Sequence, residues 1–305
     1  MRLDDFDPDI KVGDQGNRGG GLGGFGGGGG MLMGLLPFVF SRFGCGGVVV
    51  LLAIAFFLGG NPLGLIGGGQ QTPSGQIAPR SGLGNATQIC DASPDKKAAC
   101  NAFSSADNIW AAVFRQSGET FQQPALMFYD QNGQSGCGAA QSAMGPFYCP
   151  SDQTIYLDAS FFDELQQKYG ASGDFAQDYV IAHEFGHHIQ QLLGTSDKVQ
   201  REMQQSSPAQ ANALSVRLEL QADCYAGVWA GLNRDRMDPG DLQEGLTAAH
   251  AIGDDTLQKE AQGRVVPDSF THGTSAERMA WLKRGVETAD PSQCDTFSGP
   301  IDIAG

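Results

Sequence analysis

The feature that most constrains the fold is the stretch of residues 174–193, which predicts one long helix. Asp174 is followed three residues later by Gln177, the arrangement of a capping box, and Gly194 stands where a helix would end. Apolar side chains occur on several sides of this helix, namely Val180, Ile181, Ala182, Phe185 and Ile189. We therefore expect the helix to be buried, so that any ionisable residue on it needs a partner.

The same helix carries the motif H-E-x-x-H, formed by His183, Glu184 and His187. Residues four apart share one helix face, so both imidazoles can reach one ion while Glu184 lies beside them. Neutral imidazole suits zinc, an open coordination position keeps a water molecule, and a carboxylate accepts the proton of that water. We expect one Zn²⁺ per chain, bound by His183 and His187, with Glu184 as the catalytic general base.

A catalytic zinc site needs a third protein ligand, which we expect on a second helix. A capping box at Ser207 predicts a helix that runs to about Asn233. Glu219 and Asp223 are four residues apart and share one face of it. The longer side chain of Glu219 favours it as the metal ligand, which leaves Asp223 to orient a ligand histidine. Two alternatives stay open: Asp223 as the ligand, or both carboxylates in ordinary surface pairs.

Hydrolysis of a peptide bond also needs a hydrogen-bond donor for the oxyanion that forms on the carbonyl. His272, just before a predicted helix that begins at Thr274, is the first candidate, and Tyr225 is the second. The alternative for His272 is a structural role in its loop. An extended peptide substrate is expected to add as a strand beside the Phe147 or Thr154 edge.

The first third of the chain has a different composition. Many of the 44 glycines lie there, notably in 19–30 and 67–69, which indicates flexible linker. The uncharged, apolar stretch 43–66 is long enough to cross a bilayer. The alternatives are a cleaved signal peptide and a buried helix. We thus predict a Gly-rich cytoplasmic segment (1–42), a transmembrane helix (43–66), a flexible linker (67–88) and an exported zinc metallopeptidase domain (89–305).

The distribution of basic residues predicts the orientation of that span. Arg2, Lys11, Arg18 and Arg42 precede it, whereas Arg80 alone follows it closely. This bias favours a single-pass membrane protein with a cytoplasmic N-terminus and a catalytic domain in the periplasm or at the cell surface.

Six cysteines follow the predicted span, an even number that indicates disulfides in an oxidising compartment. Close spacing favours pairing of Cys90 with Cys100 and of Cys137 with Cys149, which leaves Cys224 for Cys294. No spacing has the form C-x₂-C, so a cysteine metal site is the weaker interpretation.

The net charge of −15 lies entirely in residues 81–305, because residues 1–80 carry equal numbers of acidic and basic side chains. An acidic domain repels phosphate backbones, so nucleic acid is excluded as a partner. A peptide or protein substrate and the membrane are the expected partners.

Short predicted strands precede a series of predicted helices. The strands are expected at 125–129, 147–149 and 154–157, the last two as a hairpin, and the helices at 103–116, 158–169, 174–193, 207–233, 238–252 and 274–288. This order predicts an α+β domain with a small antiparallel sheet followed by a mainly helical half.

An H-E-x-x-H helix followed by E-x-x-x-D on a later helix resembles the gluzincin arrangement. The wider sequence resembles the bacterial family called putative neutral zinc metallopeptidases. The matching stretches are 137–139, 145–150, 173–177, 183–190, 218–224 and 263–275. The resemblance covers about residues 103–298, so the first cysteine pair lies outside it. It implies a zincin-like fold, an N-terminal membrane span, an exported catalytic domain, and metal ligands at His183, His187 and Glu219.

These features predict a zinc-dependent endopeptidase that hydrolyses peptide bonds of exported or cell-envelope proteins. The alternative is a non-catalytic, membrane-tethered metal-binding or interaction module that keeps the zincin fold. The intact Glu184 favours the enzyme, because a purely structural site has no use for a base beside an open position. A zinc-dependent amidase or another hydrolase of non-peptide substrates is a third possibility.

Overall fold

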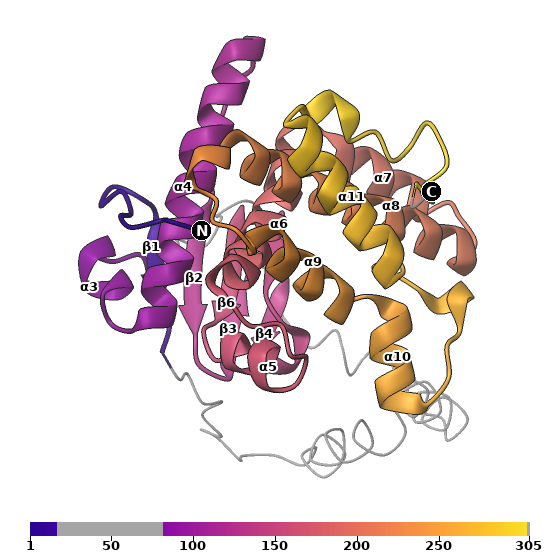
Figure 1. The fold of residues 1–305 in the computed structure, drawn as a ribbon, viewed down its shortest axis with the longest axis horizontal. Helices are drawn as coiled ribbons and strands as arrows, with labels where there is room; N and C mark the ends of the chain where they lie inside the picture. The colour runs from indigo at the N-terminus through magenta and orange to yellow at the C-terminus, as the bar shows by residue number, and fades with distance from the viewer. Residues whose placement is uncertain (17–81, 304–305) are drawn as a thin grey trace, which may run out of the picture. The chain divides into compact units, whose positions relative to one another are not determined.

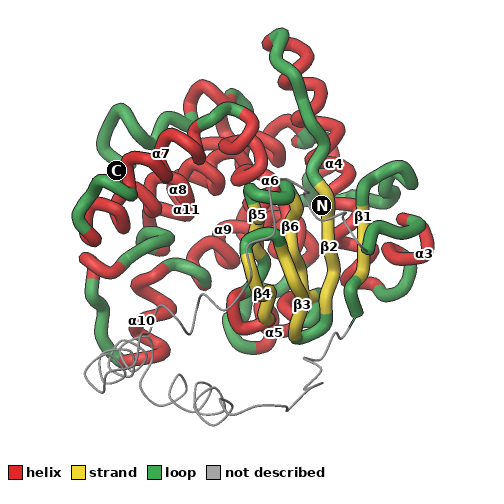
Figure 2. The backbone as a smooth tube through the Cα atoms, turned by 180° about the vertical axis from the view of Figure 1, so that it is seen from behind, coloured by secondary structure: helices red, strands yellow, loops and turns green. Residues whose placement is uncertain are grey.

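The central sheet of the computed structural model, which describes residues 1–16 and 82–303, has the strand order β1-β2-β6-β5. Its strands are β1 (Val12–Asp14), β2 (Ala125–Tyr129), β5 (Phe147–Cys149) and β6 (Thr154–Asp158). Both β1 and β6 run parallel to β2, whereas β5 runs antiparallel to β6. A two-stranded antiparallel ribbon, β3 (Asn132–Ser135) and β4 (Gly138–Gln141), lies beside the sheet (Figure 2).

The sheet is therefore mixed, and the predicted small antiparallel sheet is wrong. The expected hairpin is present as β5 and β6, in which Phe147 pairs with Tyr156. Strands β2 and β6 run parallel because residues 130–153 carry the chain back along the sheet before β6 begins. The domain remains in the α+β class.

Strand β1 comes from a part of the chain that precedes the Gly-rich stretch. Val12 pairs with Leu126, and the backbone N–H of Asp14 donates to the carbonyl oxygen of Gly82 over 3.3 Å. Residues on both sides of 43–66 thus belong to one sheet, and the predicted architecture of a domain preceded by a single transmembrane helix is wrong. Residues 43–66 themselves lie outside the described residues. Among the helices of 1–16 and 82–303, none is both long and apolar enough to span a bilayer.

Helices make up most of the rest of the domain (Figure 1). They are α3 (Ala86–Cys90), α4 (Pro94–Ser117), α5 (Phe161–Gln167), α6 (Asp174–Leu192), α7 (Thr195–Met203), α8 (Pro208–Leu232), α9 (Asp241–Ala251), α10 (Asp254–Gln262) and α11 (Ser275–Thr288). The capping box expected at Ser207 begins α8, and a second capping box at Thr274 begins α11. Helix α6 instead follows Gly173 without a side-chain cap, so Asp174 is its first residue.

The two faces of the sheet pack against different partners. Leu126, Phe128, Ile155 and Leu157 point into the main core, which includes α4 and α6. The alternate residues of the same strands form a second, smaller cluster with Ala140 and Cys149; they are Met127, Tyr129 and Tyr156. This alternation follows from the period of two along a strand. It places the main helices on one side of the sheet, as Figure 2 shows.

Three disulfides occur in the described part of the chain, and they confirm the pairing that the spacing favoured. Cys90–Cys100 links α3 to α4, and Cys137–Cys149 links the β3–β4 turn to β5. Cys224–Cys294 joins the middle of α8 to the segment that follows α11.

Candidate active site

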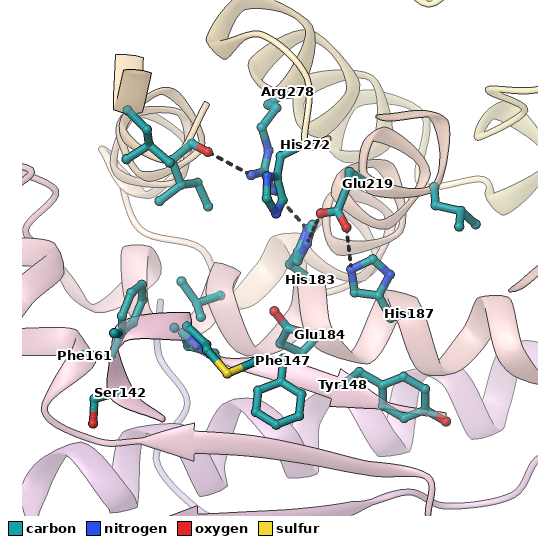
Figure 3. Close-up of a pocket in the computed structure, with 18 of the residues that line it drawn as sticks. Ser142, Phe147, Tyr148, Phe161, His183, Glu184, His187, Glu219, His272 and Arg278 are labelled. Carbon is teal, nitrogen blue, oxygen red and sulfur yellow. Dashed lines mark hydrogen bonds and ion pairs between the residues drawn. The ribbon is translucent and has the colours of Figure 1, made fainter. Parts of the chain in front are cut away.

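Helices α6 and α8 pack closely where the H-E-x-x-H motif lies. Gly186 stands between the two motif histidines, and a Cβ atom on it would lie 2.9 Å from the carbonyl oxygen and 3.0 Å from the Cα of Ala222. Because glycine has no side chain, the two helix backbones can approach this closely. Helix α8 thereby presents Glu219 to His183 and His187, as Figure 3 shows.

His183, His187 and Glu219 converge on one point between these helices. Nε2 of His183 lies 3.2 Å from Oε2 of Glu219, and Nε2 of His187 lies 3.5 Å from Oε1. Zinc bonds of roughly 2.0–2.1 Å in tetrahedral geometry place neighbouring ligand atoms roughly 3.3 Å apart. The donor set and its spacing therefore fit a zinc ion held by three protein ligands, with a fourth position left for water or substrate.

The outer nitrogen of each imidazole is held by a hydrogen bond to an oxygen atom. Nδ1 of His183 lies 2.8 Å from Oδ1 of Asp223, and Nδ1 of His187 lies 2.9 Å from Oε1 of Gln190. A carboxylate and an amide oxygen can only accept, so each Nδ1 carries the proton and each Nε2 faces Glu219. The geometry thus places Glu219 beside the Nε2 atoms of both imidazoles and Asp223 beside Nδ1 of His183.

The electrostatics of the site favour positive charge beside Glu219. Burial lowers the pKa of both histidines, but the nearby carboxylates raise it by more: Asp223 and Glu219 for His183, and Glu219 for His187. The pKa of His183 rises to about 10, and the pKa of His187 rises above its ordinary value. Burial raises the pKa of Glu219, but the two imidazoles hold it well below its usual range. A metal bound here would take the place of protons.

Arg278 on α11 completes the surroundings of Asp223 and was not predicted from the sequence. Its Nε and Nη2 donate to the two oxygens of Asp223, each over 2.9 Å, and the Tyr179 hydroxyl donates to Oδ1 over 2.6 Å. Burial raises the pKa of Asp223, but Arg278 and His183 reverse this effect and lower it to about 2. Asp223 therefore stays ionised while it is wholly buried.

A close crossing of α8 and α11 brings Arg278 to this position. A Cβ on Gly227 would lie 2.2 Å from the Leu282 carbonyl oxygen, and one on Gly285 would lie 2.1 Å from the Cys224 carbonyl oxygen. Only glycine at both positions allows the backbones to touch in this way. The sequence contains both glycines, but nothing local shows that they face each other.

The three convergent residues line a cavity of about 670 Å³ together with Glu184. Glu184 is 7% exposed and follows His183 on α6, with its carboxylate inside this cavity (Figure 3). Apolar side chains form much of the remaining wall, among them Met144, Phe147, Phe161, Tyr169 and Leu257. Glu184 thus lies in the same cavity as the candidate metal position.

His272 also lines this cavity, from the loop before α11. Its Nδ1 lies 3.1 Å from Oδ1 of Asp254, whose other oxygen accepts the backbone N–H groups of Thr271, His272 and Gly273. Tyr225, the second candidate for the oxyanion donor, instead lines a different cavity and packs edge-on against Trp110. The structure therefore brings His272 to the site and leaves Tyr225 outside it.

His188, the neighbour of His187, is wholly buried and points away from the candidate metal position. Its Nε2 donates to the Gln122 carbonyl oxygen over 2.6 Å, so its Nδ1 accepts from the Tyr148 hydroxyl at 3.0 Å. Burial lowers its pKa to about 4, which keeps the ring neutral. It fixes Tyr148, a residue of β5, in the cavity wall.

A second group of carboxylates, Asp174, Asp241 and Glu244, also lies close together. The α-ammonium group of Met1 occupies it, at 2.8 Å from Asp174 and 3.3 Å from Asp241. The α-ammonium group thus forms ion pairs with two of these three carboxylates.

Comparison with known proteins places the chain in a family. The family model described as putative neutral zinc metallopeptidase matches residues 7–297. The chain belongs to this family. The match extends well before the region of resemblance seen in the sequence and includes the residues of β1. Zinc and a hydrolytic activity are what the description of this family indicates.

Relatives within the zinc metallopeptidase family cover most of the chain. The uncharacterized protein YpfJ of Escherichia coli (strain K12) is 48% identical over 262 residues, which are 85% of this chain and 88% of the relative. The uncharacterized protein Mb2605 of Mycobacterium bovis is 36% identical over 257 residues, covering 80% of this chain and 85% of the relative. No solved structure matches the chain.

Proposed function

We propose that the protein is a zinc-dependent endopeptidase. The observation that carries this proposal is the placement of Glu184 beside His183, His187 and Glu219 in one cavity, with donor distances that fit zinc. A bound zinc ion would polarise the scissile carbonyl group and lower the pKa of a water molecule. Membership in the metallopeptidase family supports the same reaction class.

The side chains of the site have separate tasks in this reaction. Glu184 accepts a proton from the attacking water and later delivers it to the leaving amine. His272 donates a hydrogen bond through Nε2 to the oxyanion, while Asp254 holds its Nδ1. Asp223 keeps His183 in the orientation that turns Nε2 toward Glu219.

The wall of the cavity supports an extended polypeptide as the substrate. Strand β5 is one of the two edge strands of the four-stranded sheet, and its Phe147 and Tyr148 line the cavity. Strand β6 lies between β2 and β5, so the alternative edge at Thr154 is not available. We propose that a substrate lies along β5 through main-chain hydrogen bonds and places an apolar side chain against Phe147 and Phe161.

The disulfides support an oxidising location for this activity. Cys90–Cys100, Cys137–Cys149 and Cys224–Cys294 all lie in the same folded unit as the candidate site. Disulfides persist in exported proteins and are rare in reducing compartments. We therefore propose exported or cell-envelope proteins as the substrates.

The test compares the full-length wild-type chain with Glu184→Gln, because β1 belongs to the fold and a chain shortened at its N-terminus would lose this strand. Wild-type protein is expected to carry stoichiometric zinc and to cleave an unfolded protein, whereas Glu184→Gln binds zinc and cleaves nothing. Glu164→Gln is the matched control, since Glu164 lines the cavity but forms an ion pair with Lys168. Equal cleavage by wild type and Glu184→Gln would refute the proposal. Zinc binding without any cleavage by the wild type would favour a metal-binding module.

A further inference from the structure

Gln190 connects a candidate metal ligand to the interior of α8. It lies three residues after His187 on α6 and its side chain is wholly buried. Its Oε1 lies 2.9 Å from Nδ1 of His187. Its Nε2 donates to the Leu218 carbonyl oxygen over 2.7 Å and to Oε1 of Gln221 over 3.2 Å. All the polar atoms of this amide are therefore engaged between the two helices.

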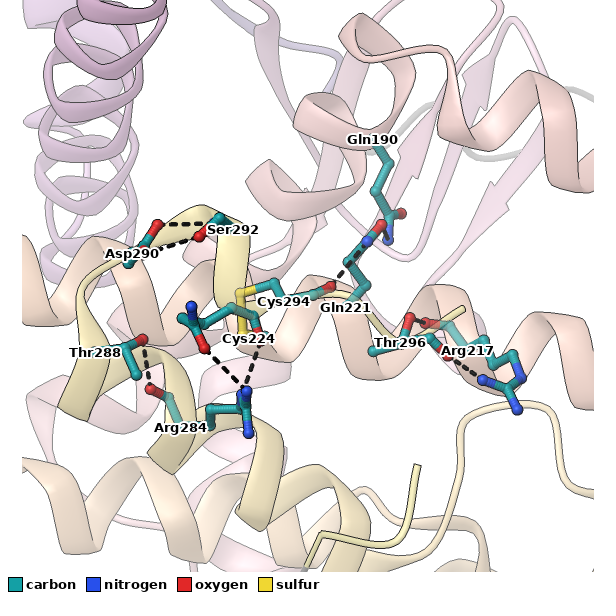
Figure 4. Close-up of a disulfide and its surroundings, with 11 residues drawn as sticks. Gln190, Arg217, Gln221, Cys224, Arg284, Thr288, Asp290, Ser292, Cys294 and Thr296 are labelled. Carbon is teal, nitrogen blue, oxygen red and sulfur yellow. Dashed lines mark hydrogen bonds between the residues drawn. A yellow bond between two sulfur atoms is a disulfide. The ribbon is translucent and has the colours of Figure 1, made fainter. Parts of the chain in front are cut away.

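The hydrogen bonds continue from Gln221 to the C-terminal segment. Nε2 of Gln221, a residue that is 7% exposed, donates to the carbonyl oxygen of Cys294 over 3.0 Å. The disulfide to Cys224 holds Cys294 against α8, one turn along from Gln221 (Figure 4). The hydroxyl of Thr296 donates to the Arg217 carbonyl oxygen over 2.7 Å and holds the same segment further along.

Two backbone carbonyl groups set the polarity of this chain of hydrogen bonds. A carbonyl oxygen can only accept, so Cys294 requires Nε2 of Gln221 and thereby turns Oε1 of Gln221 toward Gln190. The Leu218 carbonyl likewise requires Nε2 of Gln190. Oε1 of Gln190 then faces His187, whose Nδ1 must carry the proton. In the neutral ring that metal binding requires, the lone pair of His187 is therefore on Nε2, which faces Glu219.

We propose that Gln190 and Gln221 are positioning residues for the metal site, and that the C-terminal segment at Cys294, together with the Leu218 carbonyl, sets the tautomer of His187 through them. This inference rests on the proposed zinc site. The Cys224–Cys294 disulfide lies at the far end of the relay, where it keeps the terminal carbonyl in place. Residues after α11 thus contribute to metal binding without touching the metal.

The test measures zinc dissociation constants by competition with a chelator, on the full chain. Gln190→Leu removes the acceptor of His187 and is expected to raise the zinc Kd by about 10–100-fold. Gln221→Leu is expected to raise it less, because Leu218 still orients Gln190. Gln190→Glu keeps an acceptor for Nδ1 and should retain more affinity than Gln190→Leu. Gln191→Leu is the matched control, since Gln191 bonds Asp197 away from the site.

A double variant shows whether Gln221 acts through Gln190. The Gln190→Leu/Gln221→Leu protein is expected to have the same zinc Kd as Gln190→Leu, whereas independent effects would multiply. Unfolding of the zinc-free proteins records any structural cost separately. Lower stability with an unchanged Kd in Gln190→Leu would overturn the inference. Failure of the wild type to bind zinc would instead refute the proposed metal site.

Discussion

Replacement of Asp223 by leucine is expected to destabilise the protein chiefly through Arg278. Asp223 is wholly buried, Arg278 is 2% exposed, and two hydrogen bonds of 2.9 Å join them. Loss of the carboxylate leaves the guanidinium group buried without the anion that contacts it, which costs about 3–5 kcal/mol. Arg278→Met leaves Asp223 with only His183 and Tyr179 as donors and is expected to cost about as much.

The double variant Asp223→Leu/Arg278→Met tests whether the two costs share one origin. It replaces the buried ion pair by an apolar pair, so its cost in the free energy of unfolding should fall about 2–3 kcal/mol below the sum of the single variants. Denaturant unfolding of the zinc-free proteins measures all three values. Costs that add to within about 0.5 kcal/mol would refute the reasoning.

Measurements of zinc affinity separate the effect of the Asp223–Arg278 pair on the metal site from its effect on folding stability. His183 loses the acceptor of its Nδ1 in Asp223→Leu and in the double variant alike, so both should bind zinc about 10–100-fold more weakly. Arg278→Met keeps that acceptor and should retain an affinity close to the wild type. Recovery of zinc affinity in the double variant would contradict the orienting role of Asp223.

Three further predictions follow from the site. Glu219→Ala should abolish stoichiometric zinc binding and Asp223→Ala should only weaken it; the opposite order in a chelator titration would make Asp223 the ligand. Gly186→Ala gains about 1 kcal/mol of helix propensity, but it forces a Cβ into the α8 backbone and should cost about 1–3 kcal/mol net in denaturant unfolding. The hydrogen bond to Asp254 raises the pKa of His272. In the proposed reaction both Nδ1 and Nε2 of His272 donate, which requires the imidazolium form. Asp254→Asn should therefore lower that pKa and move the alkaline limb of kcat/KM to lower pH, whereas an unmoved limb would exclude this role.

The sequence was informative where one helix turn decides the geometry. His183 and His187 are four residues apart, so their shared face follows from the helix period alone. Glu219 and Asp223 share a face for the same reason, and the longer glutamate side chain is the one that contacts both Nε2 atoms. The prediction of these four positions required only that two helices pack against each other, and the structure contains them as α6 and α8.

Other parts of the site depend on packing between distant segments. Arg278 lies 55 residues from Asp223 in the sequence. Its sequence context is that of an ordinary basic residue on an amphipathic helix, and only the crossing of α8 and α11 at their glycines brings it to Asp223. Gln190 and Gln221 likewise have no local pattern that marks them. Strand β1 has three residues and includes a glycine, so it lacks the alternation by which a strand is predicted.

The pairing of β1 with β2 also has a topological consequence. The chain leaves the sheet after Asp14 and returns at Gly82, and the N–H of Gly84 donates to the Val12 carbonyl oxygen over 3.0 Å. Residues 17–81 are therefore inserted between two points that are already hydrogen-bonded neighbours. The order of the strands is set by residues outside this insertion. The domain can therefore keep its fold while the length of the insertion changes.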